Sequence, residues 1–122
     1  MRQLGQLEAA VMARLWSSAE ARSVREVVED MQQDRVIAYT TVMTVLDNLH
    51  RKRLVERTKD GRAYRYRARL SREDHAAALM EEVLAASSDR HATLLRFVEQ
   101  ISPEEVGQLR EALETMDSRD VR

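Results

Sequence analysis

The chain lacks cysteine altogether and has only one proline, three glycines and few aromatic residues among 122 positions. Without cysteine it forms neither a disulfide nor a thiolate metal site, which is typical of a reducing compartment. No apolar run approaches the roughly 20 residues that a membrane-spanning helix needs, and the amino terminus has no signal-peptide core. We therefore expect a cytoplasmic protein without membrane insertion.

What the chain does have is charge, distributed unevenly. The formal net charge is −1, and 34% of the residues are charged. Residues 51–69 hold nine basic residues against two acidic ones, whereas residues 71–122 hold six basic residues against 12 acidic ones. Because attraction to a polyanion depends on the local field, the first of these segments predicts nucleic-acid binding. The acidic second half should stay away from DNA.

Residues 39–53 predict a recognition helix. Val42, Val45, Leu46 and Leu49 form one apolar stripe at helical spacing. The opposite side carries short polar side chains and an arginine, which can reach base edges and phosphates in a major groove. An ordinary solvated helix face has the same composition, so the helix alone does not decide between the two interpretations.

Residues 54–67 predict a basic hairpin. Two short alternating runs flank Asp60-Gly61, and the central positions of such a two-residue turn need positive φ. This turn would pair Val55 with Tyr66 and place Lys59 and Arg62 beside the tip, where cations can lie along a phosphate backbone. The alternative is an ordinary surface hairpin whose edge charges prevent aggregation, but this does not explain the concentration of basic residues.

The remaining signals of the first half complete a winged helix. A stripe from Leu4 to Leu15 predicts a first helix that ends at Ser17, and Ser23 with Glu26 forms a capping box that opens a second helix. Two helices, a recognition helix and a hairpin wing predict a winged helix-turn-helix DNA-binding domain over residues 1–70. The fold class is therefore mainly α with a small β hairpin.

The second half, residues 71–122, predicts three further helices, the last opened by Ser102-Pro103-Glu104-Glu105. Their apolar stripes exceed what so small a unit can bury alone, so we expect a helical dimerisation region. Packing of these stripes against the winged helix is the alternative. The predicted dimerisation residues are Leu79, Met80, Val83, Leu94, Leu95, Val98, Ile101, Val106, Leu109, Leu113 and Met116.

The sequence predicts no enzyme. His50, His75 and His91 fall in different predicted elements, and no G-x-S-x-G motif or glycine-rich phosphate loop accompanies them. Isolated histidines are usually surface residues, and the spacing of His75 and His91 matches no helix-face ligand pattern. We therefore predict no catalytic residue, no metal site and no cofactor.

Several segments together carry a resemblance to a known family. They are Leu4-Gly5-Gln6-Leu7-Glu8, Leu15-Trp16, Thr41-Val42-Met43-Thr44-Val45-Leu46, Lys59-Asp60-Gly61-Arg62 and Ile101-Ser102-Pro103-Glu104-Glu105. In this order and spacing they resemble the penicillinase repressor family of the BlaI/MecI type, in particular an actinobacterial member. The resemblance implies a homodimeric winged-helix repressor on a palindromic operator of resistance and sensor genes, released when a protease linked to a β-lactam sensor cuts its carboxy-terminal helices.

The resemblance also implies which residues bind and where the cut falls. The DNA-binding set is Thr40, Thr41, Thr44, Asn48, Arg51, Lys52, Lys59 and Arg62. The cut would fall between Arg96 and Phe97, although the family commonly has asparagine at the first of these positions. Two other departures are Ala38, where a serine usually starts the recognition helix, and Arg53, where a glycine usually follows it. The cysteine cluster of copper-responsive relatives is missing.

Two other functions remain open at this point. One is a small-molecule-sensing winged-helix repressor of the MarR kind, with a ligand pocket between the helices of its dimer. The other is a winged helix used as a protein-interaction module. Phosphate contacts make DNA binding fall steeply with salt, so salt dependence separates the second from both repressors. Release by a ligand without proteolysis would favour the first.

Overall fold

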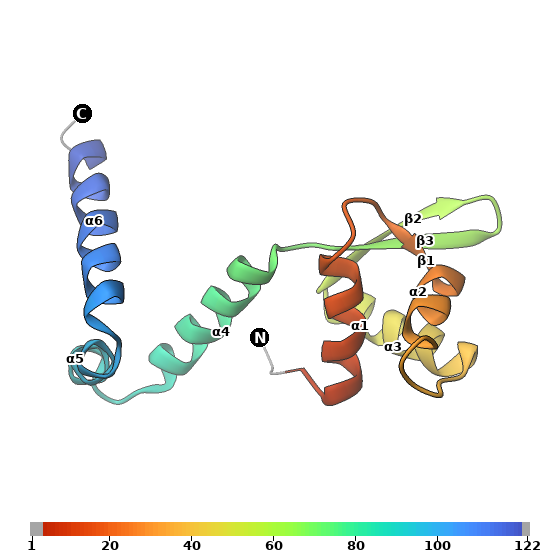
Figure 1. Ribbon diagram of the computed structural model, residues 1–122, viewed down its shortest axis with the longest axis horizontal. Coiled ribbons are helices and arrows are strands. Elements are labelled where there is room, and N and C mark those ends of the chain that lie inside the picture. The colour runs from red at the N-terminus through yellow and green to blue at the C-terminus, as the bar shows by residue number, and fades with distance from the viewer. Residues whose placement is uncertain (1–3, 121–122) are drawn as a thin grey trace. The chain divides into compact units, whose positions relative to one another are not determined.

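The computed structural model describes residues 4–120 and divides the chain into two compact units, one up to Leu79 and one from Met80 onward. The first unit contains α1 (Gln6–Trp16), α2 (Val24–Met31), α3 (Tyr39–Arg51), the β-sheet and the start of α4 (Arg72–Ala86) (Figure 1). The second contains the rest of α4, α5 (Arg90–Gln100) and α6 (Pro103–Asp120). Within the described residues, no helix is long and apolar enough to cross a membrane.

The core of the first unit lies between its three helices and the sheet. The apolar stripes expected for α2 and α3 are buried, whereas in the stripe expected for α1 Val11 and Leu15 are buried and Leu4 and Leu7 are only partly buried against the core. The sheet contributes its inward-facing residues to the same core. The buried residues are Val11, Met12, Leu15, Val24, Val27, Val28, Met31, Val42, Val45, Leu46, Leu49, Leu54, Val55 and Tyr66.

Helix starts follow the capping signals. The Ser23 hydroxyl accepts a hydrogen bond from the Glu26 amide at 3.1 Å, and the Ser23 amide donates to the Glu26 carboxylate at 2.9 Å. Ser102 and Glu105 make the same reciprocal pair at the start of α6, with both distances at 3.1 Å. Both capping boxes predicted from the sequence are confirmed, and each satisfies two otherwise orphaned donors.

The sheet differs from the expected hairpin in two respects. It has three antiparallel strands in the order β1-β3-β2. The central strand β3 (Ala63–Ala68) pairs with β2 (Val55–Asp60) on one side and with the short strand β1 (Arg22–Ser23) on the other. The expected pairing of Val55 with Tyr66 is wrong: Val55 pairs with Ala68, and Arg57 pairs with Tyr66. A shift of two residues preserves the face of each side chain, so Val55 and Tyr66 are both buried as expected.

The turn explains the shift. Gly61 has φ of 64°, and Arg62 does not share this positive φ, so the central residues are Gly61-Arg62 rather than Asp60-Gly61. A turn with glycine at its first central position needs positive φ only there. Asp60 is thereby free to pair with Ala63, which lengthens the hairpin by one pair.

The recognition helix ends earlier than expected, at Arg51. The Arg53 amide donates to the His50 carbonyl and the Leu54 amide to the Leu49 carbonyl, both at 3.0 Å. These two bonds form a Schellman motif, whose left-handed position is usually occupied by glycine. Here that position is Arg53, with φ of 64°, and it is the only non-glycine residue of the described chain with positive φ.

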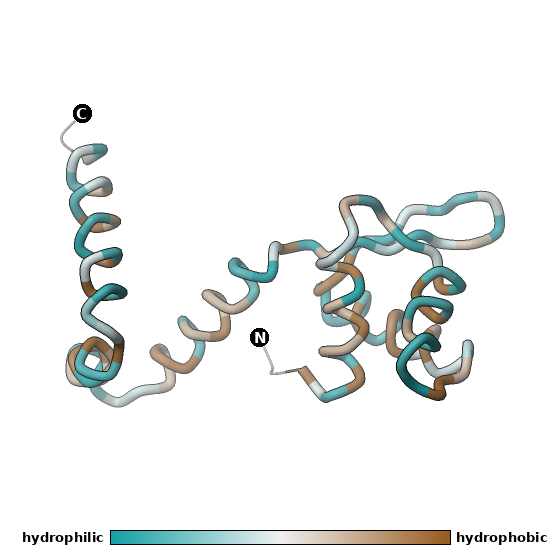
Figure 2. The backbone as a smooth tube through the Cα atoms, viewed as in Figure 1, coloured by the Kyte–Doolittle hydropathy of each residue, from teal (hydrophilic) through white to brown (hydrophobic). Residues whose placement is uncertain are grey.

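The second unit exposes its apolar stripes. None of the described side chains after Leu79 is buried, and Met80, Val83, Leu94, Leu95, Leu109, Leu113 and Met116 are all exposed. Figure 2 shows hydrophobic and hydrophilic residues alternating along α4, α5 and α6, as expected for amphipathic helices. The far end of the β2–β3 hairpin is hydrophilic in the same view.

One expectation about histidines is wrong. His75, expected at the surface, is only 6% exposed and lies against Trp16, with ring centroids 5.3 Å apart. Leu79 lies four residues after His75 on the same side of α4, but nothing in that spacing identifies a ring that covers the histidine. The sequence therefore carried no signal that an aromatic ring from the other end of the unit would cover it.

Candidate nucleic-acid interface

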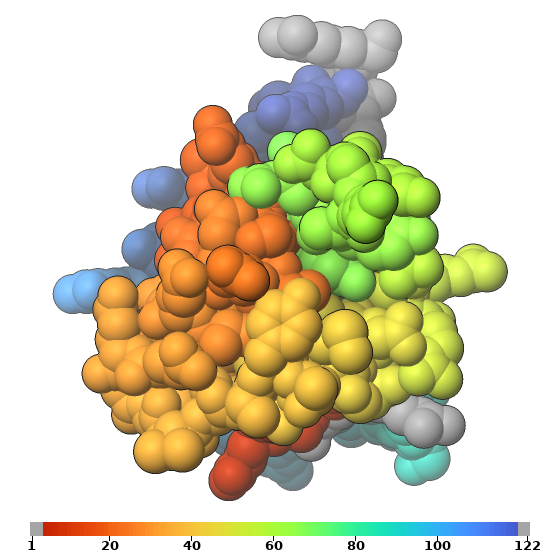
Figure 3. Space-filling view, turned by 90° about the vertical axis from the view of Figure 1, so that its right-hand side faces the viewer, coloured from red at the N-terminus to blue at the C-terminus, as the bar shows by residue number. Residues whose placement is uncertain are grey.

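The outward face of α3 and the hairpin lie side by side on one face of the first unit (Figure 3). Burial of the apolar stripe fixes the rotation of α3 about its axis, and that rotation leaves the opposite side in solvent. Thr40, Thr41, Thr44 and Arg51 are exposed there, and Asn48 is half-buried. The structure thus brings together these five residues of the sequence-predicted set on one helix face.

Local hydrogen bonds hold the polar side chains of this face. The Thr44 hydroxyl donates to the Thr40 carbonyl at 2.9 Å, which leaves its oxygen lone pair and its methyl group for a partner. The Arg51 guanidinium donates to Asn48 Oδ1 at 2.7 Å and to Asp47 Oδ2 at 3.2 Å. Exposed pairs of this kind contribute only about 0.5 kcal/mol, so Arg51 can exchange them for a phosphate or a base at little cost.

Arg57 connects the hairpin to α3. Its guanidinium carbon lies 4.2 Å from the centroid of the Tyr64 ring, and Nη1 is 3.6 Å from Asp47 Oδ1. The ion pair links the wing to the recognition helix, and the cation–π contact, which lies within the hairpin, holds the guanidinium in place. The sequence-predicted set did not include Arg57. The alternation of the strand places it on the same face as Val55, so the periodicity was a usable signal.

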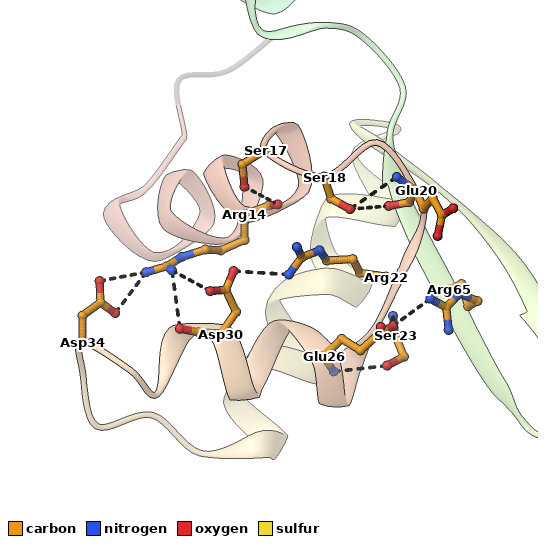
Figure 4. Close-up of polar contacts among 10 residues, drawn as sticks. All are labelled: Arg14, Ser17, Ser18, Glu20, Arg22, Ser23, Glu26, Asp30, Asp34 and Arg65. Carbon is orange, nitrogen blue, oxygen red and sulfur yellow. Dashed lines mark hydrogen bonds and ion pairs between the residues drawn. The ribbon is translucent and has the colours of Figure 1, made fainter.

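The basic residues of the hairpin are of two kinds. Arg65 already has partners: it donates to Glu26 Oε1 at 2.8 Å (Figure 4). It also donates to the Ala21 carbonyl at 2.8 Å. The Ser23 amide, together with Arg65, lowers the pKa of the Glu26 carboxyl. Within the described residues, Lys59 and Arg62 have no such partner. Arg67, which lies farther from the turn in β3, is also exposed without such a partner among the described residues, so unpaired positive charge lies both at the tip and along β3.

Lys52 lies apart from the other predicted residues. Its ammonium donates to Glu8 Oε2 at 2.6 Å and so joins the end of α3 to α1. This hydrogen bond is the main reason why the pKa of the Glu8 carboxyl is lowered. The structure places Lys52 on the side of α3 that packs on α1, away from the outward face.

A groove of about 420 Å³ separates the first turns of α3 from the hairpin. Tyr39, Met43 and Tyr64 line it, with Arg25 from α2 and Arg62 from the turn at its rim. Neither arginine has a partner within the described chain. Apolar walls with cations at the rim suit a sugar–phosphate strand. Sequence reasoning missed Arg25, Tyr39, Met43 and Tyr64, because they meet only through the tertiary fold.

An ion-pair network orients the helices that support α3. Arg14 of α1 donates to Asp30 Oδ1 at 3.1 Å and to Asp34 Oδ2 at 2.8 Å, and Arg22 donates to Asp30 Oδ2 at 3.3 Å (Figure 4). The network spans α1, β1, α2 and the loop that follows α2. It fixes the turn of the helix-turn-helix from which α3 emerges.

The family follows from comparison with known proteins. The model of the penicillinase repressor family matches residues 4–115. The chain belongs to this family. The transcriptional regulator BlaI of Mycobacterium tuberculosis is 44% identical over 118 residues, covering 94% of this chain and 86% of the relative. The resemblance inferred from the sequence motifs is thereby confirmed.

Solved structures of the family share the fold of the first unit. The DNA-binding domain of the repressor BlaI matches with a TM-score of 0.53 and 24% identity, over 59% of this chain and 87% of the other. The monomeric form of Bacillus licheniformis BlaI in complex with the blaP half-operator matches with a TM-score of 0.50 and 23% identity, over 60% and 88%. This member of the family is thus a BlaI-type transcriptional repressor with a DNA-binding winged-helix fold.

Proposed function

We propose that this repressor binds a palindromic DNA operator as a homodimer and acts by occupancy rather than by catalysis. The observation that supports this most directly is the pairing of an exposed polar helix face with unpaired cations on the adjacent wing. In this arrangement α3 enters the major groove and the tip of the wing follows the phosphate backbone. A chromosomal operator implies that the protein works in the cytoplasm of a bacterium.

The roles of the residues follow from their positions. Thr40, Thr41, Thr44, Asn48 and Arg51 would contact base edges and nearby phosphates, while Lys59 and Arg62 would contact phosphates beside the wing. The B. licheniformis relative in complex with a half-operator supports DNA as the partner. Lys52 would contribute indirectly, because its ion pair with Glu8 holds the end of α3.

A second copy of the chain would cover the exposed stripes of α4, α5 and α6. Leu95, Leu113 and Met116 are 53%, 54% and 59% exposed, and such side chains are seldom left in water in one contiguous stripe. A two-fold dimer presents two copies of α3 to two half-sites. Linking two heads in this way raises affinity by about 10²–10⁴ over a single head.

Release by proteolysis fits the same arrangement. The bond between Arg96 and Phe97 lies within α5, where Phe97 is 45% exposed and Arg96 makes a surface ion pair with Glu99 at 3.3 Å. A protease linked to a β-lactam sensor would cut here after local unwinding of the helix. The cut separates α6 from the DNA-binding unit and removes the dimer without touching a DNA-contacting residue.

Selection of random duplex DNA with the full chain tests operator binding. We expect an inverted repeat to emerge and native mass spectrometry to show two chains on each selected duplex. Recovery of no preferred sequence, or of one chain per duplex, would contradict the proposal.

The proteolytic step needs a cellular test. Cells that carry the repressor are exposed to a β-lactam, and the chain is followed by immunoblot and mass spectrometry. We expect a fragment that ends at Arg96 to accumulate as the controlled genes turn on. Release of an intact chain from its operator would instead indicate a small-molecule-sensing repressor.

A further inference from the structure

The indole of Trp16, the last residue of α1, receives contacts from three residues at the start of the second half of the chain. Its Nε1 donates to the Leu70 carbonyl at 3.0 Å. The His75 ring lies 5.3 Å away at an interplanar angle of 54°, and the Arg72 guanidinium carbon lies 5.2 Å from the indole centroid. Leu70 precedes α4, while Arg72 and His75 lie in its first turns.

Each residue between the sheet and α4 makes a hydrogen bond. β3 ends at Ala68, the Arg69 amide donates to the Leu54 carbonyl at 3.1 Å, and Leu70 is held by Trp16. The Ser71 hydroxyl then accepts from the Asp74 amide at 3.0 Å and caps α4. Because every residue of the connection is bonded, the start and the direction of α4 are fixed within the first unit.

His75 makes this contact at a cost. It is 6% exposed, and its Nε2 has no hydrogen-bond partner among the described residues. A buried polar atom without a partner is unfavourable, so packing of the ring against Trp16 must outweigh that penalty. A phenylalanine at this position would keep an aromatic ring against the indole and remove the unsatisfied nitrogen.

We propose that Trp16 and His75 are positioning residues: they form a joint that fixes α4 on the DNA-binding head and thereby sets the half-site spacing that the repressor accepts. The inference rests on the proposed palindromic dimer. α4 continues without glycine or proline from this joint to Ala86 and carries the first residues of the proposed dimer surface, Leu79, Met80 and Val83. The first two turns of α4, up to Leu79, belong to the same compact unit as Trp16.

The dependence of affinity on the distance between the two half-sites is the most sensitive measurement of this joint. One added base pair moves a half-site by about 3.4 Å and rotates it by roughly a tenth of a turn. A rigid dimer then loses its second half-site and most of the gain of about 10²–10⁴ from linkage, whereas a loose joint tolerates the change. Binding to an isolated half-site involves one head and is independent of the joint.

The experiment compares four full-length proteins on the selected palindrome, on versions with one base pair added or removed at its centre, and on a single half-site. They are the wild type, His75→Ala, His75→Phe and a control, Glu73→Ala, whose side chain is exposed in the same turn of α4 and has no partner within the described residues. We expect the wild type, His75→Phe and Glu73→Ala to prefer the selected spacing by about 100-fold. His75→Ala should prefer it by less than about tenfold, with unchanged half-site affinity.

Three other results would contradict the proposed joint or the proposed function. Equal spacing preference in His75→Ala and the wild type would overturn the joint. Loss of half-site binding in His75→Ala would also overturn it, because the contact would then support the whole head rather than the direction of α4. A wild type that binds the palindrome no better than the half-site would contradict the proposed function itself.

Discussion

Removing the guanidinium at the tip of the wing should change the salt dependence of DNA binding by a calculable amount. Arg62 lies in the turn, is exposed, and has no partner among the described residues, so Arg62→Ala removes no hydrogen bond or ion pair that the structure describes. Each phosphate contact contributes about 0.9 to the slope of log affinity against log salt. If Arg62 makes one such contact, the slope should become shallower by about 0.9.

This slope converts into a measurable ratio. Between 50 and 200 mM salt, one contact accounts for roughly a 3.5-fold loss of affinity, so the total loss for Arg62→Ala should be smaller by that factor. Fluorescence anisotropy titrations at four salt concentrations, on the operator and on random duplex DNA, measure it. Because phosphate contacts carry no sequence information, both DNAs should lose affinity about equally.

Arg119→Ala is the matched control. Arg119 is an exposed residue near the end of α6, so its substitution removes the same charge from the acidic half of the chain. We expect an unchanged slope. An unchanged slope in Arg62→Ala, or an equal change in both variants, would show that total charge rather than the tip of the wing governs the interaction.

Three further predictions concern α3. Thr44→Ala should weaken operator binding by about 1–3 kcal/mol and random-DNA binding much less, and equal losses in parallel titrations would reduce Thr44 to a backbone contact. Arg53→Gly should raise the free energy of unfolding by about 0.5–1 kcal/mol in urea titrations. The reason is that glycine removes the steric cost of the left-handed conformation, and this gain exceeds the loss from the higher entropy of the unfolded chain. Arg53→Ala should give no such gain. Lys52→Met should destabilise the fold at neutral pH, because it removes the ion pair with Glu8. Since the folded-state pKa of Glu8 is lowered, the stability difference between variant and wild type should shrink as pH falls through that pKa. A difference in thermal unfolding that does not change with pH would count against the ion pair.

The elements that the sequence predicted well are those with local signals. The stripe from Val42 to Leu49 is buried because helical periodicity leaves no other face for it, and the capping boxes at Ser23 and Ser102 form because both partners lie within one turn. The outward residues of α3 follow from the same periodicity. The family resemblance was confirmed because it rested on several such segments in order.

The elements that it predicted poorly depend on distant partners. β1 has only two residues, too few for a periodic pattern, and exists because β3 supplies its hydrogen bonds. The hairpin register depended on whether positive φ falls on Asp60 or only on Gly61, which composition does not decide. The burial of His75 required a tertiary contact with Trp16, and the ion pair of Arg57 with Asp47 required the hairpin to pack beside α3.

Hydrogen–deuterium exchange of the full chain with and without its selected operator tests the central claim most directly. The claim is that DNA lies against the outward face of α3 and the β2–β3 hairpin. We expect added protection in peptides covering residues 39–51 and 55–68, and no added protection in α5 and α6 beyond that of the free dimer. Protection confined to residues 72–120, with α3 and the hairpin unchanged, would contradict the account.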